Sequence, residues 1–239
     1  MLKFWRAKAE AWLYPAHCVL CGEAGAAGKE LCHACLAELP YNTPCCGRCA
    51  LPLAVATPAG TLCGQCQQAP PPYDSSFSLF HYAYPVDQLI QQLKFNAKLN
   101  VARLLGELMA TRLQDKCRHA PPEIIIPVPL HTVRLRERGF NQALELARPI
   151  ANRLGISVDA HSCIRTRPTA VQSLLAAKDR RANTRGAFKI IKPIDARHIA
   201  IVDDVMTTGH TLQEFAGVLR KAGARTIEVW TCARASLHT

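Results

Sequence analysis

The sequence predicts an α/β protein with a mostly parallel, doubly wound sheet, preceded by a small cysteine-rich domain. Three observations support this fold class. Patterns typical of buried strands alternate with patterns typical of amphipathic helices from about residue 76 onward. Nine of the twelve cysteines lie between Cys18 and Cys66. At residues 69–72 the cysteine pairs have stopped and a stiff Ala-Pro-Pro-Pro run begins, so we expect one domain at residues 1–70 and a second at residues 71–239.

The composition is that of a globular protein. A chain of 239 residues, of which 49% are hydrophobic, can bury a full core. It contains no apolar run long enough to cross a bilayer, which predicts a soluble protein. Residues 1–14 mix Lys, Arg and Glu with Trp and Leu, so they are not a secretory signal. We expect a helix there that packs on the protein itself, with contact to a membrane surface as the alternative.

Eight of the N-terminal cysteines form four CxxC pairs. Two residues between thiolates let both sulfurs face one ion, and two such pairs complete a tetrahedral Zn²⁺ site. The predicted ligands of two structural zinc sites are Cys18, Cys21, Cys32, Cys35, Cys46, Cys49, Cys63 and Cys66.

The pairing of these cysteines stays open at this point. Sequential pairing is the simplest assignment, interleaving is the alternative, and Cys45 could replace Cys46. Disulfides are a rival interpretation that the reducing cytoplasm disfavours. We expect Cys117, Cys163 and Cys232, which stand alone, to be ordinary buried residues.

The first half of the second domain predicts a strand, two helices and another strand. Residues 76–84 alternate in a strand-like way through Phe77, Leu79 and His81, and Pro85 ends the strand. Residues 87–113 carry leucines at helical spacing, over two helices. Residues 123–128 are mainly apolar, which is typical of a short buried strand.

The second half predicts two helices and three strands. Residues 140–153 have helical periodicity that Gly155 stops, and residues 156–163 predict a strand. Residues 199–203 and 226–231 predict the last two strands, with a helix at residues 211–221 between them. In sheets built this way, ligands bind beyond the carboxyl ends of the strands.

An acidic and hydroxyl-rich turn follows the strand at residues 199–203. Asp203 and Asp204 end this strand, and residues 207–211 read Thr-Thr-Gly-His-Thr before the helix. Gly209 permits close backbone approach, the hydroxyls donate to phosphate oxygens, and a helix N-terminus favours an anion. The aspartates would face ribose hydroxyls or a hydrated Mg²⁺. The turn therefore predicts a sugar-phosphate site, with a capped helix after a buried strand as the plainer alternative.

Two further segments extend this predicted site. Residues 127–130, Pro-Val-Pro-Leu, end a buried strand in a rigid turn, because two prolines cannot continue the ladder. Arg134 and Arg138 follow, and guanidinium forks match phosphate oxygens in bidentate fashion. A simple proline stop and a solvated, charged helix start are the alternatives.

Residues 199–212 resemble the phosphoribosyl pyrophosphate (PRPP) motif of type I phosphoribosyltransferases. With the cysteine-rich N-terminus and the run from Arg134 to Gln142, Arg-Leu-Arg-Glu-Arg-Gly-Phe-Asn-Gln, the chain is similar to the ComF family, bacterial proteins associated with natural competence. Residues 93–95 and 165–188 match as well. One departure is His210, which is bulkier than the small residue often found in the enzymes' loop.

The resemblance implies a set of functional residues. PRPP would be bound by Val205, Met206, Thr207, Thr208, Gly209, His210, Thr211, Pro127, Val128, Pro129, Leu130, Arg134 and Arg138. Asp203 and Asp204 would be the catalytic pair, and residues 172–188 would form a hood over the site.

The formal charge of +11 favours a polyanionic partner, with solubility and ligand steering as the alternative. With the resemblance, it implies an accessory protein of transformation that binds PRPP, Mg²⁺ and single-stranded DNA in the cytoplasm. Other DNA-uptake proteins and a peripheral position at the inner membrane are further expectations. The expected DNA-binding residues are Arg165, Arg167, Lys178, Arg180, Arg181 and Arg185.

Two other functions remain open from the sequence. An active phosphoribosyltransferase would transfer ribose 5-phosphate from PRPP to a nitrogenous acceptor, although no base-gripping segment is recognisable after Trp230. A PRPP-sensing regulator would keep the site without turnover.

Overall fold

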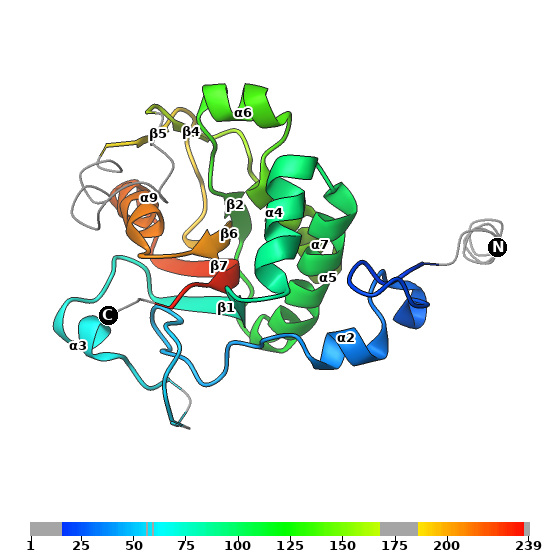
Figure 1. The fold of residues 1–239 in the computed structure, drawn as a ribbon. Helices are drawn as coiled ribbons and strands as arrows, with labels where there is room; N and C mark the ends of the chain where they lie inside the picture. Colours follow the sequence, from blue (N-terminus) through cyan, green and yellow to red (C-terminus); the bar gives the residue numbers. More distant parts are fainter. Residues whose placement is uncertain (1–15, 56, 59, 168–185, 237–239) are drawn as a thin grey trace.

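The structure is a computed structural model that describes residues 16–55, 57–58, 60–167 and 186–236. Five parallel strands form the central sheet in the order β1-β7-β6-β2-β3 (Figure 1). Their bounds are Ser75–His81 for β1, Ile124–Pro127 for β2, Ser157–Val158 for β3, His198–Met206 for β6 and Thr226–Arg234 for β7. This arrangement confirms the predicted parallel sheet.

A two-stranded antiparallel ribbon, β4 (Cys163–Arg165) and β5 (Phe188–Ile190), stands apart from the sheet. The prediction of one strand over residues 156–163 is wrong, because this segment holds β3 and the start of β4. A turn divides them, in which Asp159 Oδ1 accepts hydrogen bonds from the N–H groups of His161 and Ser162, both at 2.9 Å. The carboxylate satisfies the turn's backbone donors locally, so the strand does not continue.

Helices cover both faces of the sheet, which confirms the doubly wound architecture (Figure 1). Within the described residues, the helices of this domain are α4 (Val86–Asn96), α5 (Leu99–Lys116), α6 (Thr132–Arg138), α7 (Gln142–Leu154) and α9 (His210–Lys221). One face of the sheet, including Val202 and Trp230, shares a core with α4, α5 and α7. The other, including Ile201 and Val229, packs on α9. Because neighbouring strand residues point to opposite faces, β6 and β7 are apolar on both sides.

The two helices predicted within residues 87–113 are confirmed. Ala97, in the left-handed region with φ of 51°, separates α4 from α5. The short helix α6 was not predicted, since its seven residues bury none of their side chains and so leave no apolar periodicity.

The cysteine-rich segment packs against the edge of the sheet. It contains η1 (Ala26–Gly28), α2 (His33–Ala37) and α3 (Gly64–Gln68). Residues 40–42 run antiparallel to β1: Asn42 N donates to Leu79 O at 3.0 Å, and His81 N donates to Pro40 O at 2.8 Å. This pairing covers what would be the free edge of β1.

Contacts across residue 70 are therefore extensive. Leu31 and Leu39 share the core of α5, and Arg103 Nη2 lies 2.9 Å from Glu30 Oε2. The boundary between residues 70 and 71 stays a prediction. The three isolated cysteines are buried, as expected. In the described part of the chain we find no helix with the length and hydropathy needed to cross a membrane.

Helices α5 and α7 approach closely where Gly106 meets Pro149. A Cβ atom at Gly106 would lie 2.7 Å from the carbonyl oxygen of Leu146 and would also overlap the ring of Pro149. By contrast, a Cβ at Gly217 of α9 would meet nothing within 4 Å. The first glycine is required by helix contact, whereas the second is not.

These two glycines give a matched pair of variants. Gly106→Ala should lower the free energy of unfolding by about 1–3 kcal/mol, because the helices must separate. Gly217→Ala should raise it by about 0.5–1 kcal/mol, since alanine is the better helix former. Urea unfolding monitored by circular dichroism measures both, and equal effects of the two substitutions would contradict the close contact of α5 and α7.

Candidate phosphate site and metal centres

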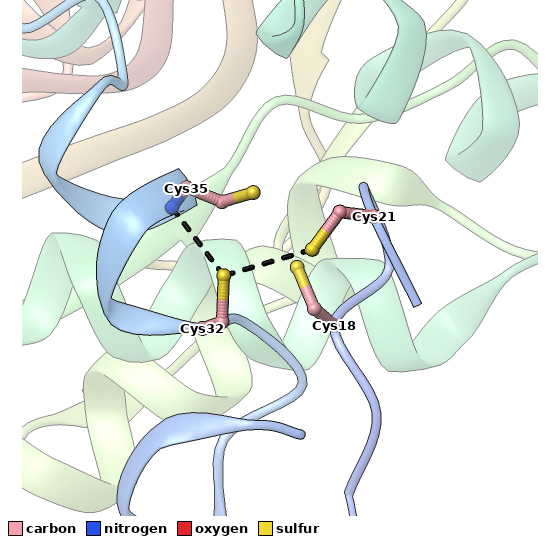
Figure 2. A group of neighbouring side chains, drawn as sticks. All are labelled: Cys18, Cys21, Cys32 and Cys35. Carbon is pink, nitrogen blue, oxygen red and sulfur yellow. Dashed lines mark hydrogen bonds between the residues drawn. The ribbon is translucent and has the colours of Figure 1, made fainter. Parts of the chain in front are cut away.

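The eight CxxC cysteines gather into two groups of four, paired in sequence order. One group is Cys18, Cys21, Cys32 and Cys35 (Figure 2), and the other is Cys46, Cys49, Cys63 and Cys66. Within each group the sulfurs lie within 4.8 Å of one another. A tetrahedral Zn²⁺ with Zn–S bonds of about 2.3 Å separates its sulfurs by about 3.8 Å. The Cys21–Cys32 and Cys49–Cys63 sulfur distances, 3.7 and 3.6 Å, fit this geometry.

In each group, backbone N–H groups stabilise the thiolate of one cysteine. Burial raises the pKa of Cys18, but hydrogen bonds from the N–H groups of Cys32, Cys21 and Leu20 lower this pKa to about 6. Burial also raises the pKa of Cys46, but hydrogen bonds from backbone N–H groups, those of Cys49 and Cys63 first, lower this pKa to about 7. Because zinc binds the thiolate, these N–H groups prepare the ligands. The two groups support structural zinc, while Cys45 lies outside both.

The two groups differ in their exposure to solvent. Cys21 is exposed, and Cys32 and Cys35 are half-buried, whereas all four thiols of the second group are buried. The second group therefore forms a small hydrophobic core of its own, against which Leu51 and Leu53 pack.

The candidate phosphate site lies at the carboxyl end of β6. This strand continues to Met206, three residues beyond its predicted end, and pairs with β7 over its whole length. Asp203 and Asp204 therefore lie within the strand and point to opposite faces of the sheet. Periodicity does not predict this extension, because residues 203–206 are not uniformly apolar.

Asp204 points toward α4 and α7. Asp204 is 4% exposed, and its carboxylate forms an ion pair with Lys94 Nζ. Gln142 Nε2 donates a hydrogen bond to Asp204 Oδ1 at 3.4 Å. Burial raises the pKa of Asp204, but the charge and hydrogen bond of Lys94 outweigh it and hold the pKa below its ordinary value. Asp204 is therefore ionised and already paired with a cation.

Asp203 lies on the opposite face and is half-buried. Burial and the neighbouring negative charge of Asp204 raise the pKa of Asp203 well above its ordinary value. Its Oδ1 accepts from Asp204 N at 2.9 Å. The two adjacent acids are thus electrostatically different, and the charge of Asp203 acts on Arg165 of the β4–β5 ribbon.

The loop at residues 207–211 joins β6 to α9. Gly209 has φ of 80°, a left-handed conformation that favours glycine, and α9 begins at the next residue. His210 Nδ1 lies 3.1 Å from Thr208 Oγ1, so the bulky ring is held by the loop itself. Met206 is 1% exposed and belongs to the core, and Val205 is half-buried. A ligand in the loop would therefore contact these two residues through their backbone groups.

The segment at residues 127–130 follows β2, the neighbour of β6. Strand β2 ends at Pro127, as expected for this segment, and one further hydrogen bond, from Val128 N to Val202 O at 2.9 Å, follows the strand. The missing N–H of Pro127 would face β3, and β3 pairs only with Ile124 and Ile125, so its absence costs no ladder bond. Val128 and Pro129 are buried, Leu130 is half-buried, and Asn141 Nδ2 donates to Val128 O at 3.0 Å.

Of the two predicted phosphate arginines, the structure connects one to the aspartates. Arg138 Nη1 donates to Gln142 Oε1 at 2.5 Å, and Gln142 in turn contacts Asp204. Burial lowers the pKa of Arg138, and the charge of Asp204 opposes this. Arg134 is exposed and pairs with Glu137 at 3.0 Å on α6.

Two of the six predicted DNA-binding residues, Arg165 and Arg167, lie within the described residues. Arg165 is half-buried, with its guanidinium carbon 5.3 Å from the centre of the Phe188 ring, while Arg167 is exposed. Burial lowers the pKa of Arg165, and the charge of Asp203 opposes this shift. Arg165 forms a β-bridge with His131, directly after residues 127–130. Lys178, Arg180, Arg181 and Arg185, and the predicted hood except its last residues, lie outside the described residues.

Lys94 and Gln142 are the site residues that sequence reasoning missed. Lys94 lies one helical turn beyond Ile90, on the buried stripe of α4. A charged residue on such a stripe was the available signal, because a buried cation needs a partner.

The match to protein families agrees with this geometry. Residues 9–67 match the double zinc ribbon domain, and residues 140–236 match the phosphoribosyl transferase domain. The chain thus combines a double zinc ribbon with a phosphoribosyltransferase domain.

Three relatives align over most of the chain. The DNA utilization protein YhgH of Escherichia coli O157:H7 is 38% identical over 224 residues, which are 92% of this chain and 97% of the relative. The protein of the same name from Salmonella typhimurium is 36% identical over 207 residues, 85% and 90% of the two chains. Competence protein F of Haemophilus influenzae is 36% identical over 225 residues, 91% and 96% of the two chains. The chain belongs to the competence protein F family, ComF.

Replacing Lys94 tests the charge assignment of the aspartates. Lys94→Met should lower the free energy of unfolding by about 3 kcal/mol near pH 8, because a buried carboxylate loses its counter-charge. Without Lys94, the pKa of Asp204 rises above its value in the unfolded chain. The native protein then takes up a proton as the pH falls, so the loss of stability should shrink toward pH 5.

The control is the double variant Lys94→Met, Asp204→Asn, whose side chain at position 204 cannot ionise. Its loss of stability should be smaller near pH 8 and nearly independent of pH. Urea unfolding across this pH range measures both variants, and a pH-independent loss in Lys94→Met alone would refute the assignment.

Proposed function

We propose that this protein is a competence-associated protein that binds PRPP with Mg²⁺ and handles single-stranded DNA. The observation that carries the proposal is the near full-length similarity to relatives named for DNA utilization and competence. The phosphoribosyl transferase domain supports PRPP as the small ligand. A cytoplasmic location, beside other DNA-uptake proteins and peripheral to the inner membrane, is part of the same proposal.

The proposed PRPP site uses the carboxyl ends of two adjacent strands. The loop at residues 207–211, at the N-terminus of α9, would hold the 5′-phosphate. Residues 127–130 would border the pyrophosphate, with Arg138 as the nearer cation and Arg134 farther out. Arg165 fits this anion site better than a DNA surface, because it is half-buried and forms a β-bridge with His131, directly after residues 127–130.

Asp203 and Asp204 would have different roles in this site. Asp203 is the acid available to ribose hydroxyls or to the hydration shell of Mg²⁺, since Asp204 is occupied by Lys94. Mg²⁺ would arrive bound to the pyrophosphate. The positive charge of Mg²⁺ would also favour ionisation of a carboxyl that faces it.

An active phosphoribosyltransferase is the second candidate. The match of residues 140–236 to the phosphoribosyl transferase domain favours it, because that domain is named for this transfer. Such an enzyme would transfer ribose 5-phosphate to a nitrogenous acceptor and release pyrophosphate.

Ligand-induced stabilisation tests PRPP binding. With Mg²⁺ and PRPP at about a hundred times its Kd, the melting temperature should rise by several degrees, because the ligand binds the native state. Asp203→Asn should reduce this rise, whereas Asp195→Asn, at an exposed position, should not. No shift in the wild-type protein at millimolar PRPP would remove the proposal. Pyrophosphate release with a panel of nucleobases would then separate enzyme from binder.

A salt series tests binding to single-stranded DNA. The logarithm of the affinity should fall linearly with the logarithm of salt concentration, with a slope of about −0.7 per phosphate contacted. Arg167→Gln should weaken binding and reduce the slope by about 0.7 without changing PRPP affinity. Arg148→Gln, on the outer face of α7, is the matched control. Affinity that does not depend on salt would count against the arginine surface.

A further inference from the structure

Arg234, the last residue of β7, is a charged side chain that is only 3% exposed. Its guanidinium donates to backbone carbonyls of three separate segments. Nε donates to Cys49 O at 3.1 Å, and Nη1 donates to Met206 O at 3.0 Å, to Ala235 O at 2.8 Å and to Thr207 O. One buried side chain thus joins the second cysteine group, the end of β6 and the segment after β7.

These bonds fix the direction of two peptide units in the loop at residues 207–211. In a planar trans peptide the C=O and the N–H point in opposite directions. Because the carbonyls of Met206 and Thr207 point at Arg234, the N–H groups of Thr207 and Thr208 point away from it. Arg234 therefore sets the orientation of the first amides of the proposed phosphate loop.

The register of the sheet makes this contact possible. Arg234 and Met206 are partners across β7 and β6, and Ala235 N also donates to Met206 O, at 2.9 Å. Among residues 16–55, 57–58, 60–167 and 186–236, no carboxylate forms an ion pair with Arg234. The hydrogen bonds of Arg234 named above go to backbone carbonyls, and its positive charge adds to the attraction of the loop for an anion.

The contact with Cys49 extends the connection to the second cysteine group. Cys49 shares its proposed ion with Cys46, Cys63 and Cys66, all of them buried. Ordering of this CxxC turn fixes the carbonyl that receives Arg234 Nε. Nothing comparable joins the first group to the loop among the hydrogen bonds of the described residues.

We propose that Arg234 is a positioning residue that couples the second cysteine group to the anion site, so that metal in this group raises affinity for a sugar phosphate. The proposal rests on the proposed PRPP site for its ligand. The coupling itself is a property of the protein's backbone and can be measured without any ligand.

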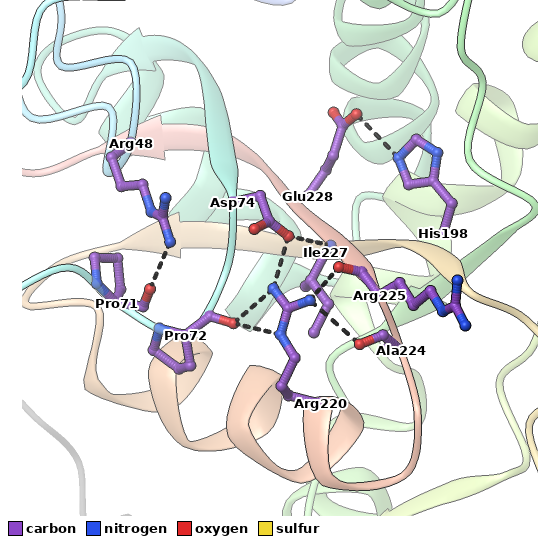
Figure 3. Close-up of polar contacts among 10 residues, drawn as sticks. All are labelled: Arg48, Pro71, Pro72, Asp74, His198, Arg220, Ala224, Arg225, Ile227 and Glu228. Carbon is purple, nitrogen blue, oxygen red and sulfur yellow. Dashed lines mark hydrogen bonds and ion pairs between the residues drawn. The ribbon is translucent and has the colours of Figure 1, made fainter.

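Arg220, in the last turn of α9, provides a matched control (Figure 3), because the loop at residues 207–211 lies at the other end of that helix. It also binds backbone carbonyls, with Nη2 at 3.3 Å from Pro72 O and Nη1 at 3.2 Å from Ala224 O and bonded to Arg225 O, and its Nη2 lies 2.7 Å from Asp74 Oδ2. These contacts tie the segment before β1 to α9 and β7, away from the loop. Arg220→Met should therefore lower stability without changing the loop.

The test uses the full-length, zinc-loaded protein and two readouts. Hydrogen exchange followed by mass spectrometry reports the loop directly, and calorimetric titration with PRPP and Mg²⁺ reports affinity. Arg234→Met should speed exchange of peptides covering residues 206–209 and weaken PRPP binding roughly 10- to 100-fold, as loss of hydrogen bonds from a charged group does. Arg234→Lys, which keeps the charge without the fork, should give an intermediate effect and serves where Arg234→Met does not fold.

Cysteine variants test the metal part of the proposal. Cys66→Ser and Cys21→Ser should each lower the measured zinc content by one ion, from the second and the first group respectively. Only Cys66→Ser should loosen the loop, and it should add little to Arg234→Met, because coupled changes are not additive.

The outcomes separate this inference from the proposed function. Unchanged loop exchange in folded Arg234→Met or Arg234→Lys would overturn the positioning role, and equal loosening by Cys21→Ser and Cys66→Ser would overturn the coupling. If the wild-type protein does not bind PRPP while Arg234→Met still loosens the loop, the proposed ligand is wrong and the positioning role stands.

Discussion

Strand β6 runs in parallel register between β7 and β2, and the groups of the candidate site take their positions from that register. Each step along the strand alternates the face on which a side chain lies. Asp204 is thereby directed to the helices on one face, and Asp203 to the opposite face. The same pairing sets Met206 beside Arg234 and Val202 beside Pro127, so two loops emerge next to each other at one edge of the sheet. A shift of one residue would exchange the two aspartates and separate both loops from their supports.

Asp203 and Asp204 are adjacent and identical in sequence, but their electrostatic surroundings differ. Lys94 stabilises one negative charge on Asp204, and that charge disfavours a second on Asp203. Arg138 and Arg165 approach the pair from α6 and from the β4–β5 ribbon. An anionic ligand with its own cation would enter a site whose charges are already balanced locally, which limits the desolvation cost of binding.

Much of the architecture could be predicted because it follows from periodicity and spacing. The CxxC pairs predicted two tetrahedral groups, and the alternating strands and helices predicted the parallel sheet. What could not be predicted depends on contacts between distant segments. Lys94 and Asp204 lie more than a hundred residues apart in the chain, and Arg234 contacts Cys49 from the opposite end. The predicted end of β6 is too early for the same reason, because pairing with β7 extends the strand beyond Asp203 and Asp204 to Met206.

The short antiparallel contact between residues 40–42 and β1 has a consequence for how this protein fails. An uncovered parallel edge strand is a template for another chain, and β1 would be such a strand without that contact. Residues 40–42 lie between the two cysteine groups, so their position depends on the folding of both. Loss of metal from these groups would therefore uncover an edge of the sheet for pairing with a strand of another chain, which favours aggregation.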